Sequence, residues 1–126
     1  MDAYYIVNDP NDPIAVKATE IRKQEYLFWR EVKPDLEDDF DISCHTLSAR
    51  TGLSERRTRD ITMALYRLAE LPLTKALQES YYFLDFSRLI TIDAVLSKLG
   101  DIPTEILERI DQELARYLTP TKPGQV

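Results

Sequence analysis

The chain contains very little cysteine, histidine or glycine. Its 126 residues include one cysteine, one histidine and three glycines. A single cysteine excludes an internal disulfide and indicates a reducing compartment. All-β folds need many tight turns, which prefer glycine, so the low glycine count favours helices. The seven prolines lie mostly between apolar segments, where they mark helix ends.

Long apolar runs are also missing. None approaches the ~20 residues that a membrane-spanning helix needs. The first residues, MDAYYIVNDP, lack the basic stretch followed by an apolar one that defines a signal peptide. We therefore expect a cytoplasmic protein that makes no membrane contact.

Positive charge is scarce overall but concentrated in one segment. The formal net charge is −6, which argues against a generic nucleic-acid coat protein. Between residues 43 and 69, however, five arginines stand against Glu55 and Asp60. These arginines are Arg50, Arg56, Arg57, Arg59 and Arg67. One basic island in an acidic chain is more informative than the total charge.

The apolar pattern predicts an all-α fold, a small bundle of about six helices in one domain over residues 1–126. Residues 1–11 are expected to form an irregular arm, with a short extended piece through Tyr4–Val7, and residues 119–126 a polar tail. The expected helices cover 13–33, 44–51, 54–71, 72–77, 85–100 and 103–118. The acidic segment 35–41 is interpreted as a solvated connector.

The first predicted helix has a clear apolar stripe. Its members recur every three or four residues, interrupted only by Glu25, and Leu27 and Trp29 widen the face. They are Ile14, Ala18, Ile21, Phe28 and Val32. Such a stripe normally faces the core, so we expect it to be buried.

Residues 47–61, LSARTGLSERRTRDI, have the pattern of a helix-turn-helix. Ser48 is the small residue four positions before the turn, Gly52 permits the turn, Leu53 fills the corner and Ser54 caps the second helix. Leu47 and Ile61 are the expected core anchors. Thr58 alone departs from the pattern, because valine or isoleucine is usual there.

A helical wheel places Arg56, Arg59 and Arg67 away from the core side of the second helix. Arg57 lies nearer the core but in the first turn, and Arg50 ends the preceding helix. Outward arginines can reach guanine edges or phosphates, so we predict duplex DNA as the partner. Two other readings stay open: a purely structural turn, and a protein-interaction or self-association module with exposed aromatics such as Trp29 or Tyr82.

No constellation for catalysis, metal binding or a cofactor is present. Cys44 and His45 are adjacent, so their side chains cannot face each other on a helix, and a zinc site needs about four ligands. Cys44 is interpreted as a small core residue. The aromatic segment Tyr81–Phe86 is expected in the core, with an oligomer contact as the alternative. We predict a protein that is not an enzyme.

Four segments from Leu47 to Gln125 also resemble a known family. They are LSARTGLSERRTRD, ALYRLAELPLTKAL, LDFSRLITIDAVLSKLGDIPTE and LTPTKPGQ. In this order they resemble the helical domain of unknown function that precedes HNH endonuclease modules in many actinobacterial proteins, the 13E12-repeat family. Ser80 and Arg88 depart from that family, which usually has glycine and histidine near these positions.

The resemblance implies an all-α fold and a link to DNA-processing proteins. It does not imply nuclease activity, because an HNH site needs several His and Asn residues around a metal. This chain has one histidine, His45, and two asparagines, Asn8 and Asn11. We expect the chain to be a truncated form or a fragment of a longer nuclease-like protein.

Overall fold

The computed structural model describes residues 9–37 and 39–118, so most of the predicted arm and all of the polar tail lie outside the described residues. Within that part the fold is all-α, with six helices and no strand. The helices are α2 (Pro13–Val32), α3 (Phe40–Thr51), α4 (Glu55–Ala69), α5 (Pro72–Tyr81), α6 (Phe86–Ser97) and α7 (Thr104–Leu118). None of these described helices is long and apolar enough to cross a bilayer.

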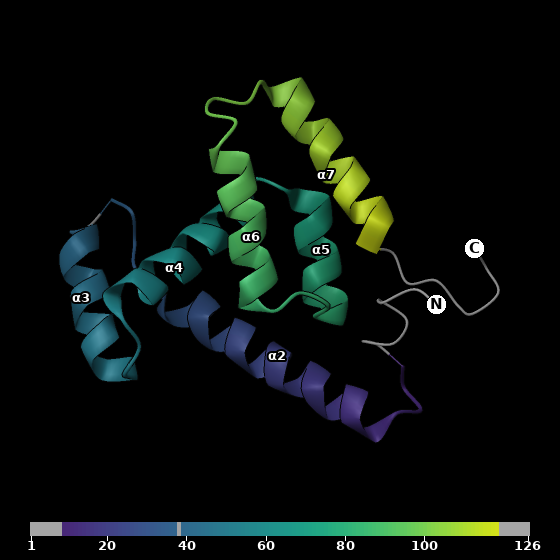
Figure 1. Cartoon of the computed structure of the whole chain (residues 1–126), viewed down its shortest axis with the longest axis horizontal. Coiled ribbons are helices and arrows are strands. Elements are labelled where there is room, and N and C mark those ends of the chain that lie inside the picture. Colours follow the sequence, from purple (N-terminus) through teal and green to yellow (C-terminus); the bar gives the residue numbers. More distant parts are fainter. Residues whose placement is uncertain (1–8, 38, 119–126) are drawn as a thin grey trace.

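Helix α4 lies at the centre of the arrangement. It packs against α2, α3, α5 and α6, and α7 packs against α5. In Figure 1, α2 runs along the lower edge, α3 lies at one end, and α6 and α7 stand above. Helix α3 and the start of α4 therefore lie at the opposite end of the molecule from α7 (Figure 1).

Three of the predicted helix starts are confirmed by side-chain caps, at Asp12, Ser54 and Asp85. The Asp12 carboxylate accepts from Ile14 N at 2.9 Å, with Pro13 in the first helical position. The Asp85 carboxylate accepts from Arg88 N at 2.9 Å. A side-chain acceptor satisfies one of the free N–H groups at each start, which is why short polar residues at these positions identify a helix start in the sequence.

Two predicted boundaries are wrong. Helix α3 begins at Phe40 instead of residue 44, so the acidic connector is shorter than expected. Its first flanking residue, Asp39, has φ 27° and makes no side-chain cap, so no local signal announces the start. Helix α5 continues to Tyr81, beyond the predicted end at residue 77, and stops because Tyr82 is left-handed with φ 52°.

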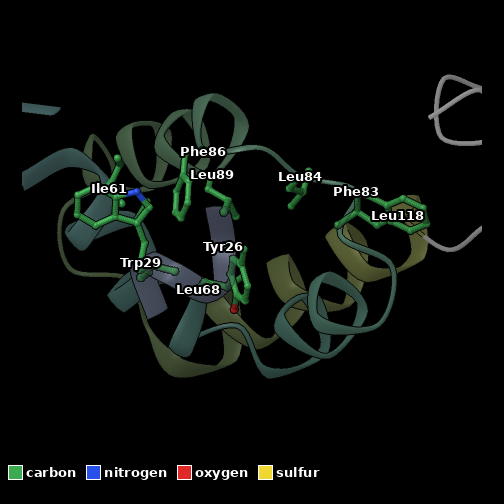
Figure 2. Packing of buried hydrophobic residues seen from close by; sticks show 11 residues of the cluster. Tyr26, Trp29, Ile61, Leu68, Phe83, Leu84, Phe86, Leu89 and Leu118 are labelled. Atoms are coloured by element: carbon green, nitrogen blue, oxygen red, sulfur yellow. The ribbon is translucent and has the colours of Figure 1, made fainter. Parts of the chain in front are cut away.

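The core is an apolar cluster shared by α2, α4 and α6. Figure 2 shows Tyr26 and Trp29 of α2 facing Ile61 and Leu68 of α4, with Phe86 on the α6 side. The residues that share one face of α4 are buried: Thr58, Ile61, Ala64, Leu65 and Leu68. The aromatic segment divides, since Phe83 and Phe86 are buried whereas Tyr81 is exposed and stacks on Phe83.

The predicted core face of α2 is right for Trp29, which is buried, and for Leu27 and Val32, which pack half-buried against the core, but it is wrong for the other large members. Ile14 is 79% exposed, Ile21 is 66% exposed and Phe28 is 46% exposed. The buried residues are Ala15, Tyr26 and Trp29, a stripe shifted by one position. Tyr and Trp bury more area than an aliphatic residue, and the adjacent side of α2, which carries Ile14, Ile21 and Phe28, is left facing solvent. Burial of Trp29 also removes it as the exposed aromatic contact considered above.

The outer ends of α6 and α7 are likewise less buried than their apolar patterns suggest. Leu89 and Leu96 of α6 are buried, but Val95 and Leu99 are exposed. In α7 only Leu118 of the predicted apolar residues is buried, and Ile106 is exposed. Helix α7 packs mainly on α5. The side of α7 that faces α5 is therefore covered, while the neighbouring apolar side of α7 stays exposed.

Buried polar side chains tie the elements together. The Gln78 amide donates to Leu84 O and accepts from Leu84 N, both at 2.9 Å. The Asp111 carboxylate of α7 accepts from Leu73 N and Thr74 N at 2.9 Å and from Thr74 Oγ1 at 2.7 Å. Asp111 thus caps α5 from another helix, at a start where Leu71 offers no side-chain cap.

A second cross-helix group fixes α2 on α5. Glu79 Oε2 accepts from the Tyr26 hydroxyl at 3.0 Å and from Arg30 Nη1 at 2.8 Å. Burial disfavours the charged form of Glu79, but the hydrogen bonds from Arg30 and Tyr26 outweigh it and hold the pKa of this carboxyl below its usual value. Burial, and then the neighbouring Glu79 charge, raise the pKa of Tyr26.

Replacing Asp111 should destabilise the fold. Asp111→Ala removes three hydrogen bonds and leaves the buried Thr74 hydroxyl without this acceptor, so we expect a loss of about 2–3 kcal/mol. Urea unfolding followed by circular dichroism measures it, with an unchanged m-value as the sign of an intact native state. Glu108→Ala, an exposed position on the same helix, is the control. A change under about 0.5 kcal/mol for Asp111→Ala would contradict the capping role.

Glu79 should make stability depend on pH. Its folded-state pKa is lowered, so its contribution is present above the ordinary glutamate pKa of about 4.3 and is lost as the pH falls through the lower folded-state value. Glu79→Gln should therefore cost about 1 kcal/mol at pH 7 and progressively less below about pH 4. Chemical denaturation of both proteins across that range measures the difference. A constant difference would show that the ionised carboxylate is not responsible.

Candidate nucleic-acid interface

The turn between α3 and α4 has the glycine that the sequence predicts for it in a left-handed conformation. Gly52 is left-handed with φ 79°, and its N–H donates to Ser48 O at 3.0 Å. A side chain at this φ is strained, which explains the glycine. The Ser48 hydroxyl donates to Leu53 O at 2.6 Å, so the small residue four positions before the glycine also closes the turn.

The start of α4 is fixed by two hydroxyl groups. The Ser54 hydroxyl accepts from Arg57 N at 3.0 Å, the predicted cap. Thr58 is fully buried, and its hydroxyl donates to Ser54 O at 3.0 Å. Threonine can therefore stand where an aliphatic residue was expected, because its polar atom has a partner inside the helix.

The contact between α3 and α4 follows the pattern in part. Ile61 and Cys44 are buried, and Leu47 packs half-buried against the core, as predicted. Leu53 differs, because it is 39% exposed instead of filling the corner. The serine, glycine and cap therefore set the turn without an apolar plug.

Three of the predicted arginines are available for an external contact. Arg50 lies in the last turn of α3, and Arg56 and Arg57 lie in the first turn of α4, on either side of the Gly52 turn. Arg50 and Arg56 are exposed and Arg57 is half-buried. No ion pair joins any of the three to another described residue. Their charge is thus not cancelled by an adjacent carboxylate.

Arg59 is exposed in part but has a partner. Its Nη1 lies 2.6 Å from Asp41 Oδ1 of α3, and its guanidinium lies 5.7 Å from the centre of the Phe40 ring. The hydrogen bond to Asp41 and the charge of that carboxylate raise the pKa of Arg59. A DNA phosphate would have to compete with Asp41 for this side chain.

Arg67 does not project outward as the helical wheel predicts. Its side chain is only 19% exposed and lies against α6, with Nε 3.0 Å from Asp93 Oδ1. Nη1 binds Glu70 Oε2 at 2.9 Å, and Nη2 donates to Ser97 Oγ at 3.4 Å. The helical wheel treats α4 as an isolated helix, whereas in the fold α6 packs beside the part of α4 that carries Arg67. Arg67 therefore joins two helices, and we leave it out of the candidate contact set.

We name the set Arg50, Arg56, Arg57 and Arg59 the arginine surface. Its acidic neighbours are Asp41, Glu55 and Asp60. Asp41 binds Arg59, and Glu55 Oε1 contacts Nδ1 of the exposed His45. Asp41 is thus paired with an arginine, whereas Glu55 and Asp60 are paired with no lysine or arginine among the described residues and weaken the attraction of the remaining arginines for phosphate.

The sequence reasoning missed Asp41 and Phe40. Both were assigned to the solvated acidic connector, although they form the first turn of α3. The available signal was weak: an aromatic followed by an acidic residue suits a helix start, but the residue before them makes no cap.

No arrangement of three or more His, Cys, Asp or Glu side chains able to hold a metal ion occurs among residues 9–37 and 39–118. An open hollow of about 830 Å³ lies along α7, away from the arginine surface. It is lined by Ile106, Arg109, Ile110, Glu113, Leu114, Arg116 and Tyr117.

Comparison of the chain with protein-family models, with curated proteins and with solved structures found no match. The resemblance to the HNH-associated family therefore stays a prediction.

Proposed function

We propose that the chain binds duplex DNA through the α3–α4 pair, as a helix-turn-helix that performs no chemistry of its own. The observation that carries this proposal is the group of three arginines without ion-pair partners, Arg50, Arg56 and Arg57, around the turn. Arginine binds phosphate oxygens and guanine edges in bidentate geometry. The turn at Gly52, which the Ser48 hydroxyl closes, and the Ser54 cap at the start of α4 support the same assignment.

The N-terminal half of α4 is the part that would enter the major groove. In helix-turn-helix proteins the first turns of the second helix reach the base edges, while the preceding helix contacts the backbone. Arg56 lies in the first turn of α4, and Met63, further along the same side, is exposed. Arg50 at the end of α3 suits a phosphate contact. The C-terminal half of α4 is covered near Arg67 by α6.

The overall charge of −6 sets the expected strength of binding. A few arginines neutralise a few phosphates, and the acidic remainder of the chain repels DNA at long range. We therefore expect micromolar affinity at low salt that weakens steeply as salt is added.

Removing the available arginines tests the proposal. The triple variant Arg50→Ala, Arg56→Ala, Arg57→Ala should weaken binding to random duplex DNA at least tenfold and reduce the salt slope by about two to three. Fluorescence anisotropy with a labelled duplex at several salt concentrations measures both. The matched control replaces Arg88, Arg109 and Arg116, which lie on α6 and α7, with alanine. It changes the net charge equally and should have a much smaller effect.

Two outcomes would contradict the DNA-binding assignment. One is the absence of binding by the unmodified chain at low salt, where attraction is greatest. The other is equal weakening by both triple variants, which would mean that only the total charge matters.

Asp41 should restrain DNA binding. Asp41→Asn removes the carboxylate that holds Arg59 and frees a fourth arginine for phosphate. We expect binding to tighten about threefold to tenfold and the salt slope to rise by about one. Asp101→Asn, an exposed position between α6 and α7, is the control for the change in net charge. If the two aspartate variants behave alike, Arg59 does not contact DNA.

A further inference from the structure

The outward side of α2 carries a regular apolar stripe that the described fold leaves largely uncovered. Its members follow one another at spacings of four, three, four, three and four residues: Ile14, Ala18, Ile21, Glu25, Phe28 and Val32. Ile14, Ile21 and Phe28 are exposed, Ala18 is half-buried, and Val32, at the end of the stripe, is half-buried because part of it packs against the core. This is the a/d spacing by which two helices pack side by side. We call it the outer stripe.

The orientation of α2 is fixed, so the stripe cannot turn inward. On the neighbouring side of the helix Trp29 is buried, and Arg22 Nε donates to Tyr82 O at 2.7 Å. Tyr26 and Arg30 both bind Glu79. Rotating α2 to bury the outer stripe would expose two large aromatics and break these hydrogen bonds. Within the part of the chain that the structure describes, Ile14 and Ile21 therefore remain exposed.

The charges beside the stripe identify its partner. Lys17, Gln24 and Glu31 follow one flank at intervals of seven residues, and all three are exposed. No ion pair joins Lys17 or Glu31 to another described residue. When two copies of this helix lie antiparallel, the first residue of the flank in one copy meets the last residue of the flank in the other copy. Lys17 of one copy then faces Glu31 of the second copy, twice by symmetry.

We propose that α2 is a homodimer contact in which the outer stripes of two copies of this chain pack antiparallel. Ile14 then meets Val32 of the second copy, Ala18 meets Phe28, and Gln24 lies at the two-fold axis. A parallel arrangement would instead keep Lys17 of one copy about two heptads away from Glu31 of the second copy along the helix, so that the two could not pair. The reciprocal Lys17–Glu31 match therefore selects both a second copy as the partner and the antiparallel direction.

Glu25 is the polar member of the stripe and lies close to the two-fold axis. A single polar residue at such a position lowers the affinity of paired helices but fixes their register. In the antiparallel arrangement Gln24 of the second copy lies beside Glu25 and can donate to its carboxylate. The dimer is therefore expected to be weak and to be strengthened by Glu25→Leu.

Charge reversal gives a test that does not involve DNA. Sedimentation equilibrium at low salt should show the unmodified chain as a concentration-dependent dimer. Lys17→Glu or Glu31→Lys alone should raise the dimer Kd about tenfold, because each creates two like-charge contacts. The double variant Lys17→Glu, Glu31→Lys should restore the original Kd. Lys98→Glu, an exposed position after α6, should change little.

Two apolar variants complete the test. Ile21→Glu should leave a monomer, and Glu25→Leu should lower the Kd about tenfold. Circular dichroism confirms that each variant is folded, which is expected because both side chains face solvent. A strict monomer at millimolar concentration would overturn the proposal. So would a dimer whose Kd is unaffected by Ile21→Glu, or one that the double charge reversal fails to restore.

Discussion

The structure depends on the burial of one face of α4. Four of the other helices pack against α4, and its inner residues form the middle of the core (Figure 2). Two of them, Thr58 and Thr62, are polar and fully buried, yet each hydroxyl donates to a carbonyl one turn earlier in the helix. The face can therefore be enclosed without an unpaired group. Enclosing it leaves the other side of the first two turns facing solvent, and that side carries Arg56 and Arg59.

The parts of the fold that local chemistry determines were predictable from the sequence. Asp12, Ser54 and Asp85 cap helices where expected, because a cap needs only a short polar side chain within three residues of a free N–H. Gly52 ends α3 as expected, since a left-handed residue is a local requirement. The buried face of α4 was predictable for a different reason: its apolar residues form one stripe, and no competing stripe exists on that helix.

Features that depend on distant partners were not predictable. Helix α2 offers two stripes shifted by one residue, and periodicity alone favours the one that includes Ile14 and Ile21. The other is chosen because its polar members find partners on α5 and beyond, such as Glu79, more than forty residues away in the sequence. The same holds for the candidate site. Arg67 is turned onto α6 by Asp93, and Arg59 is held by Asp41, so a wheel drawn for one helix cannot show either outcome.

The arginine surface and the outer stripe are related, because a dimer formed through the outer stripe would present two arginine surfaces to one duplex. Each arginine surface has three arginines without ion-pair partners, which is few for a stable complex with a polyanion, and the chain as a whole is acidic. Two arginine surfaces held together by the outer stripes would engage one duplex with the second contact made at a high effective concentration. The salt dependence would then rise with the number of phosphates contacted by both copies. Dimerisation through α2 leaves the arginine surface free, because the arginines lie on α3 and α4 while the stripe lies on α2. The same fold would therefore bind DNA weakly as a monomer and more tightly as a dimer.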